Sequence, residues 1–210
     1  FAADGKTLSR DRDGPGSDQG TYAFTSIAPQ TAIRREDVMT WNSFDGRPPG
    51  SRTIGFMSQI SPDGRFAVST LNEEVYTANF RDYRFLQVFY PTRGILAIYN
   101  RTSNRIEPLP GADDPRYVHT NAVWSPDASY LVFARAQARD PYPPGGRMAE
   151  SANDPNELPV RYDLYRIPFN NGRGGRAEPI AGASNNGRSN SFPKISPDGR
   201  WIGFVQSRNG

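Results

Sequence analysis

Three observations predict an all-β fold built from repeated four-stranded antiparallel sheets. One turn sequence recurs along the chain, a short apolar segment lies on either side of each clear copy, and turn-forming and aromatic residues are abundant. The 210 residues include 20 Gly, 19 Pro, 12 Phe, 10 Tyr and 3 Trp. Aromatic side chains favour strands, whereas Gly and Pro favour the turns that join them.

The repeated turn has the pattern Ser-Pro-Asp-Gly, with clear copies at residues 60–66, 124–130 and 195–201 and a weaker copy at 1–7. Proline presets φ at one turn position, the aspartate accepts hydrogen bonds from amides two residues on, and glycine supplies a positive φ. An Asp-Gly pair between apolar segments is a strong hairpin signal. The residues expected to organise these turns are Asp4, Asp63, Gly64, Asp127, Asp198 and Gly199.

The second clear copy departs from this pattern, because Ala128 stands where the other two have glycine. A residue with a Cβ atom rarely adopts positive φ. We therefore expect the turn at 127–129 to be distorted or of a different type.

Apolar segments before and after each turn predict the first two strands of each repeat. Further segments predict a third strand and an outer fourth strand, and a proline in each outer strand suits a sheet edge, where its missing amide costs nothing. Pro108 and Pro179 are 71 residues apart, as are Asp127 and Asp198, so the repeat keeps its register. The expected strands are 54–60, 66–69, 94–99 and 106–109, then 121–124, 130–134, 162–167 and 177–180, and finally 192–195 and 201–205.

Four short strands per repeat are typical of a β-propeller blade. The turn aspartates are 59, 64 and 71 residues apart, more than the roughly 40–50 residues of most blades. The excess predicts two long inserted loops, at 71–93 and 135–161. We expect about three blades in an open, partial β-propeller: a blade remnant at 1–53, blades at 54–110 and 118–181, and the start of the next blade at 190–210.

Composition excludes several classes of protein. Without Cys there is neither a disulfide framework nor a cysteine zinc site, and one His cannot build a histidine-rich metal site. No apolar run approaches the roughly 18 residues that a transmembrane helix needs. The 25 basic residues are interleaved with 22 acidic ones and the net charge is only +3, which argues against a nucleic-acid partner. We expect no cofactor in this chain.

With three copies of the turn and matching outer strands, nearly the whole chain resembles the TolB-like β-propeller family. The segments 82–94 and 183–187 also resemble bacterial proteins in which such repeats follow a c-type haem motif. The resemblance implies a bacterial protein exported to the periplasm or the cell surface. Both ends interrupt the repeat, so we expect a fragment that partners the remaining blades of its parent chain. Any haem would belong to the upstream part of that parent, because this chain has no Cys.

Loops on a rigid scaffold are where binding usually resides. The connections from each outer strand to the next blade, together with the two insertions, are expected to gather on one face. Their polar and aromatic side chains suit a protein or peptide partner, and the alternative is that they only cover the ends of the blades. The candidate binding residues are Arg93, Asp113, Asp114, Arg116, Tyr117, His119, Arg139, Tyr142, Asn153, Asp154, Asn185, Asn186 and Arg188.

Two weaker signals concern metal binding and catalysis. Asp11, Asp13 and Asp18 surround two glycines, as calcium ligands could, but the segment lacks the downstream Glu of an EF-hand loop and also suits a plain turn. A Ser-His-Asp triad would have to use His119, and no Gly-x-Ser-x-Gly sequence is present. We therefore expect neither a metal site nor an enzyme.

The function expected from these observations is a non-catalytic scaffold that presents loops for protein or peptide binding in the bacterial cell envelope. Trp41, Trp124 and Trp201 are expected to pack in the core between blades. Two alternatives remain open: the propeller is an accessory domain of a prolyl-oligopeptidase-like peptidase, or of a c-type haem electron-transfer protein. In both, the active part lies outside these residues.

Overall fold

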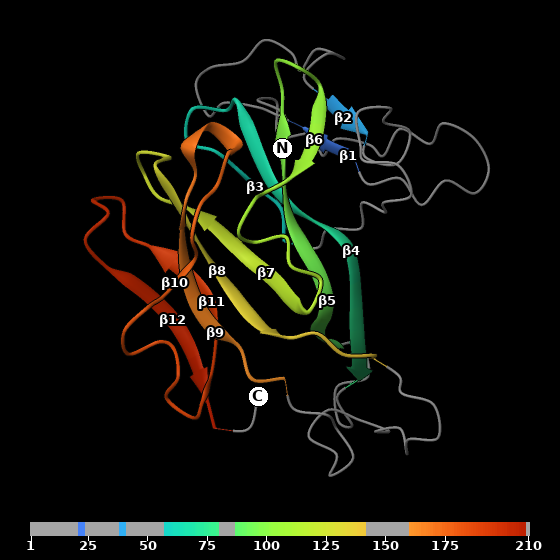
Figure 1. The fold of residues 1–210 in the computed structure, drawn as a ribbon, viewed down its shortest axis with the longest axis vertical. Helices are drawn as coiled ribbons and strands as arrows, with labels where there is room; N and C mark the ends of the chain where they lie inside the picture. Colours follow the sequence, from blue (N-terminus) through green and yellow to red (C-terminus); the bar gives the residue numbers. More distant parts are fainter. Residues whose placement is uncertain (1–20, 24–37, 41–56, 80–86, 142–159, 209–210) are drawn as a thin grey trace, which may run out of the picture.

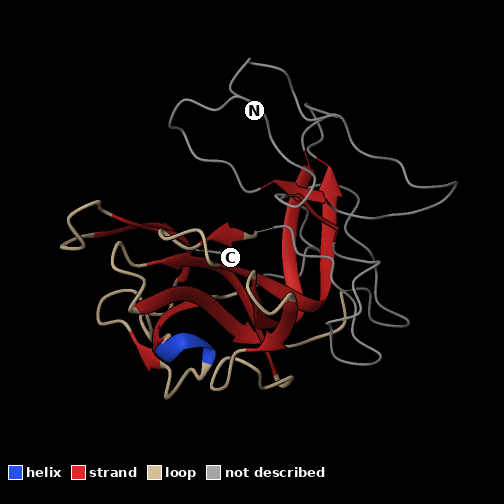
Figure 2. Cartoon of the chain, turned by 90° about the horizontal axis from the view of Figure 1, so that it is seen from above, coloured by secondary structure: helices blue, strands red, loops and turns tan. Residues whose placement is uncertain are grey.

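The computed structural model describes residues 21–23, 38–40, 57–79, 87–141 and 160–208. Within this part of the chain the regular structure is almost entirely strand, with one 3-10 turn, η2 (Asn170–Gly172) (Figure 2). A short antiparallel pair, β1 (Thr21–Ala23) and β2 (Val38–Thr40), comes first in the chain.

Three antiparallel sheets then follow one another and lie side by side (Figure 1). The first contains β3 (Gln59–Ile60), β4 (Phe66–Asn79), β5 (Gln87–Asn100) and β6 (Arg105–Pro108). The second contains β7 (Tyr117–Trp124), β8 (Tyr130–Gln137), β9 (Asp163–Pro168) and β10 (Glu178–Pro179). The third is the pair β11 (Ser189–Ile195) and β12 (Ile202–Ser207). Strands pair in chain order, and β7 contacts both β3 and β11. The predicted fold class, an all-β partial propeller, is confirmed.

The repeated turn is held by the same hydrogen bonds in all three copies. The Ser61 hydroxyl donates to the Asp63 carboxylate at 2.6 Å and accepts from the Phe66 amide at 3.0 Å. The Arg65 amide donates to the same carboxylate at 3.1 Å. The other two copies repeat these bonds. Because hydrogen bonds favour the ionised carboxylate, they hold the pKa of each turn aspartate below its ordinary value.

The turn that lacks glycine keeps the geometry of the other two. Ala128 has a φ of +56°, close to +69° at Gly64 and +70° at Gly199. The expectation of a distorted or different turn is therefore wrong. The Ser129 hydroxyl donates to the Asp127 carboxylate at 2.8 Å, a bond that this copy adds to the shared set. The turn thus keeps the shared hydrogen bonds even though an alanine is strained in the left-handed region.

A second repeated contact guides the chain from each outer strand to the next sheet. The Leu96 amide donates to the Ala112 carbonyl at 2.9 Å, and the Leu96 carbonyl accepts from the Leu109 amide at 2.9 Å. Leu164 makes the two equivalent bonds in the second sheet, also at 2.9 Å. The third strand of each sheet thereby fixes the direction in which the following loop leaves.

Apolar side chains are buried on both faces of the first sheet. Phe66 and Val68 lie in the interface with the second sheet, together with Leu131 and Phe133 of β8. Ala67, between the first two in sequence, belongs to a separate buried cluster. Successive side chains of a strand point to opposite faces, so the start of β4, from Phe66 to Val68, is apolar on both faces.

The tryptophans divide between the core and the surface. Trp124 is buried as expected, with its ring centroid 4.7 Å from that of Phe169 and its Nε1 donating to the Gln59 carbonyl at 3.0 Å. Trp201 is 69% exposed, so its expected core position is wrong. It corresponds to Phe66 of the first repeat, which is buried against the following sheet. Trp41 lies outside the described residues.

The segment 71–93, expected to be an inserted loop, is largely strand. β4 and β5 stay paired as far as Asn79 and Gln87, with an irregularity near the start of this extension. β-branched and aromatic residues such as those at 88–90 favour strands, a signal that the spacing of the turns hides. Of the other expected loop, 135–161, the first three residues belong to β8.

The Ala128 turn yields a stability prediction. Replacing Ala128 with Gly should raise the free energy of unfolding by about 0.5–1 kcal/mol, because the relief of left-handed strain exceeds the greater chain entropy of glycine. The reciprocal change Gly64→Ala, where an added Cβ meets no atom within 4 Å, should destabilise by a similar amount. Urea unfolding of the two variants tests this, and equal midpoints would contradict it.

Candidate functional site

A cavity of about 340 Å³ lies where the three sheets and the β4–β5 hairpin meet. Its walls combine apolar side chains with a few polar groups. The lining residues are Met57, Phe89, Tyr90, Pro91, Asn121, Tyr162, Ser189, Ser191, Phe192, Val205 and Ser207.

Three lining residues occupy one position of the repeat. Met57, Asn121 and Phe192 each precede the aspartate of their turn by six residues. Corresponding positions of successive repeats are brought together because the first strands of the sheets adjoin one another. The sequence signal for this site is therefore a shared position, not a shared residue type.

Irregularities in β7 and β11, the first strands of their sheets, set the direction of two of these side chains. The pairing of β7 with β8 shifts just after Thr120, and that of β11 with β12 shifts just after Ser191. Asn121 has a φ of +53° and Phe192 a φ of +51°. Bulges of this kind re-aim side chains and are common beside functional sites. A positive φ is uncommon for a bulky residue, so the strain at Phe192 serves the cavity wall.

A hydrogen bond between the first and second sheets holds another part of the cavity wall in place. The Tyr162 hydroxyl donates to the Pro91 carbonyl of β5. Burial raises the pKa of Tyr162, which keeps the hydroxyl protonated as a donor. The Ser189 hydroxyl donates to the Val160 carbonyl at 3.0 Å and accepts from the Tyr162 amide at 3.3 Å. The cavity is thus preformed.

Three other polar side chains of the cavity lack a hydrogen-bond partner among the described residues. Within the described residues, the side chains of Asn121 and Ser191 make no hydrogen bond. The Ser207 hydroxyl oxygen is buried and also lacks one. An amide and two hydroxyls can both donate and accept. The cavity can therefore bury an apolar group and hydrogen-bond to a polar group beside it.

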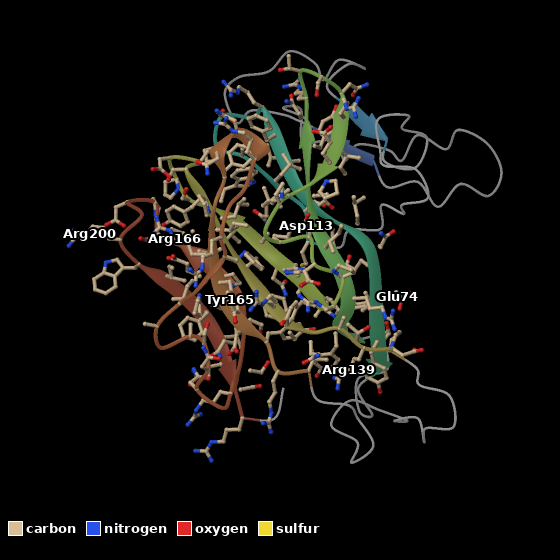
Figure 3. The ribbon with its side chains drawn as sticks, viewed as in Figure 1. Glu74, Asp113, Arg139, Tyr165, Arg166 and Arg200 are labelled. Carbon is tan, nitrogen blue, oxygen red and sulfur yellow. The ribbon has the colours of Figure 1, made fainter. Side chains whose placement is uncertain are left out.

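Three of the predicted binding residues do meet at one end of the sheets. Arg93 Nε lies 3.3 Å from Glu74 Oε2 and donates to the Arg139 carbonyl at 3.2 Å. The Ala138 amide donates to the Arg116 carbonyl at 2.9 Å, which joins the third arginine to this end. Figure 3 shows Glu74 and Arg139 on this side of the molecule, far from Arg200.

The remaining predicted residues of the described loops stabilise turns. Asp113 accepts from the Gly111 amide at 3.0 Å, and Asp114 pairs with Arg116 at 2.6 Å. Hydrogen bonds from Arg116 lower the pKa of Asp114 to about 2. In the loop before β11, the amides of Asn185 and Arg188 donate to carboxylate and amide oxygens, and Asn186 bonds to Asn190.

Of the ten predicted binding residues that the structure describes, none lines the cavity. The sequence does not single out the cavity-lining residues, because they lie in or beside strands, where apolar and small polar side chains are typical of a structural role. Several predictions fall outside the described residues: the binding candidates Tyr142, Asn153 and Asp154, the calcium candidates Asp11, Asp13 and Asp18, and the turn residue Asp4. Within the described part, no group of three His, Cys, Asp or Glu side chains could hold a metal ion.

His119 and Tyr117, expected in a loop, belong to β7. His119 is only 1% exposed, because β7 lies between sheets, and its ring centroid is 5.5 Å from that of Phe133. Its Nδ1 is buried without a hydrogen-bond partner. Burial, reinforced by the Arg135 guanidinium, lowers the pKa of His119 to about 4 despite a hydrogen bond to the Gly94 backbone and the charges of nearby aspartates.

Arg135 joins the rings around this histidine into a stack that the sequence does not signal. Its guanidinium carbon lies 3.6 Å from the Tyr165 ring centroid and 4.6 Å from that of Tyr117. Such cation–π contacts stabilise when partly desolvated. His119 is therefore part of the structural core of the second sheet.

No family model and no curated protein matches the chain. Two similar solved structures are hydrazine synthase from Kuenenia stuttgartiensis, at 16% identity and a TM-score of 0.42, and TolB from Acinetobacter baumannii, at 17% and 0.41. The matches cover 71% and 82% of this chain but only 36% and 30% of those chains, respectively. No helix among the described residues is long and apolar enough to cross a membrane.

The buried histidine predicts a pH dependence of stability. The folded-state pKa of about 4 lies below the ordinary 6.5, so the unfolded chain binds the proton first as pH falls. Stability from His119 should be complete above pH 6.5 and fall by about 3 kcal/mol by pH 4. The turn aspartates, whose pKa values are lowered, lose their contribution only at more acid pH.

Urea unfolding between pH 7 and 4.5, with His119→Leu and His119→Asn as variants, isolates this contribution. Both variants should flatten the loss of stability across this range. Parallel curves for the variants and the unaltered chain would show that His119 does not titrate as inferred.

Proposed function

We propose that the chain is a non-catalytic β-propeller scaffold that binds a polypeptide partner, and that the cavity beside Met57, Asn121 and Phe192 receives an apolar side chain of that partner. The observation that carries this proposal is the convergence of one position from three repeats on a preformed cavity. Concave, mostly apolar sites with a few placed polar groups are the usual form of a ligand site.

The chemistry of the walls favours a peptide over a small ion or a sugar. Met57, Phe89 and Phe192 offer apolar surface, and no described charged side chain lines the cavity. Asn121 and Ser191 can pair with the amide and carbonyl of a peptide backbone, which presents both kinds of group in every residue. A cavity of about 340 Å³ suits one large side chain and its adjoining backbone.

A role in the bacterial cell envelope belongs to this proposal as its broader setting. It is supported by the resemblance of the repeated turns to the exported TolB-like proteins. His119 is enclosed in the second sheet and does not line the cavity, in keeping with binding instead of catalysis.

Peptide selection tests the proposal. A displayed library of random dodecapeptides is panned on the intact chain, and the affinity of enriched peptides is measured by fluorescence anisotropy. We expect enriched peptides to share an aromatic or long aliphatic residue. Ser191→Phe, which fills the cavity, should weaken binding at least about ten-fold, equivalent to about 1.4 kcal/mol.

The matched control is Ser103→Phe, which adds the same side chain to an exposed turn between β5 and β6 and should leave affinity unchanged. Thermal unfolding of both variants checks that they fold. Enrichment of peptides whose affinity is indifferent to Ser191→Phe would overturn the cavity as the site.

A further inference from the structure

β12 has an open edge where its counterparts have none. β4 and β8 are each paired on both sides, whereas within the described residues β12 is paired with β11 alone. The three strands occupy the same place in their repeats, since each follows the same turn. The repeat therefore specifies a neighbour for β12 that no described strand supplies.

The composition of this edge differs from that of the other sheet edges. The outer strands β6 and β10 are short, and each ends in a proline, Pro108 and Pro179. Proline and short length are the means by which proteins protect a permanent edge from pairing. Residues 201–207 contain neither a proline nor a charged side chain. β12 thus has the sequence of an interior strand.

Side-chain exposure supports the same conclusion. In β8, Phe133 and Ala134 are fully buried. Their equivalents in β12, Phe204 and Val205, are 37% and 55% exposed. Together with Trp201 they leave exposed apolar surface on both faces of the third sheet at this edge. Its burial would stabilise whatever strand covers it.

The two complete sheets show what covers the equivalent positions. The position of Val205 corresponds to Thr70 and Ala134, and these pair with Leu96 and Leu164. Both leucines are buried. A leucine is thus placed opposite this position in both sheets.

The position of Ile202 is covered in the same way. It corresponds to Ala67 and Leu131, which pair with Tyr99 and Ile167, both buried. A large apolar residue therefore follows the leucine by three positions in both third strands.

The strands that pair with β4 and β8, which are β5 and β9, share a second feature. In each, the leucine is hydrogen-bonded through amide and carbonyl to a turn further along the chain, formed by 109–112 or 180–183. Both turns have the sequence apolar-x-Gly-Ala and begin 13 or 16 residues after the leucine.

We propose that the free edge of β12 is a strand-addition site whose occupant is an antiparallel strand of this same repeat, with leucine opposite Val205, a large apolar residue opposite Ile202, and an apolar-x-Gly-Ala turn 13–16 residues later. The β12 of a second copy has neither the leucine nor the turn. The inference does not rest on the proposed function, although Val205 also lines the cavity.

A fusion tests the proposal. A flexible linker joins the C-terminus of the full chain to a second copy of residues 160–184, which includes β9, β10 and their turn. Tethering makes pairing intramolecular. Hydrogen exchange followed by mass spectrometry should show at least about ten-fold slower exchange over 201–207 than in the unfused chain, because those amides become paired.

The control fusion carries Leu164→Asp and Ile167→Asp in the appended copy only and should leave exchange over 201–207 at the rate of the unfused chain. Protection of β7 and β8 in all three proteins confirms that the body is folded. Equal exchange in both fusions would overturn the proposal. So would an unfused chain that sediments as a dimer with 201–207 already protected, since a second copy would then be the occupant.

Discussion

Along β8 the side chains alternate between two apolar interfaces. Leu131 and Phe133 join the cluster shared with the first sheet, Ala134 and Ala136 join the cluster on the other side, and all four are buried. A sheet that is apolar on both faces cannot be stable alone in water. The side-by-side order of the sheets, the burial of His119 and the exposure of Trp201 all follow from this requirement for a neighbour on each face.

The polar turns complement that apolar interior. Each turn serine shares its hydroxyl between an aspartate and a backbone amide, so the hairpin closes without help from the rest of the fold. The persistence of this arrangement at Ala128, with a φ of +56°, indicates that the hydrogen bonds outweigh the backbone strain. Local turn chemistry and interface burial thus act on adjoining residues, since Phe66 directly follows the first turn and is buried in the interface.

The difference between local turn chemistry and burial between sheets explains which features the sequence predicts. The turns depend on residues at most five apart, so Ser61, Asp63 and their repeats predict them directly. Pro108 and Pro179 likewise predict the outer edges. The sequence does not predict the extension of β4 and β5, because these residues pair far from any turn signal. His119 was misplaced because burial depends on the neighbouring sheets. Met57, Asn121 and Phe192 share a position but no chemistry, so no residue pattern marks the cavity that they line.

The outer prolines also have a consequence for how such a structure can grow. Pro108 and Pro179 lie in the outer strands β6 and β10, so neither sheet can widen by pairing a fifth strand at its outer edge. Further sheets are added in a different direction, through the faces, which are apolar on both sides in the first two sheets. Duplication of the repeat can therefore change how far the arc extends without changing its thickness. The repeat position that Met57, Asn121 and Phe192 share would then contribute one further side chain beside the cavity for each added repeat.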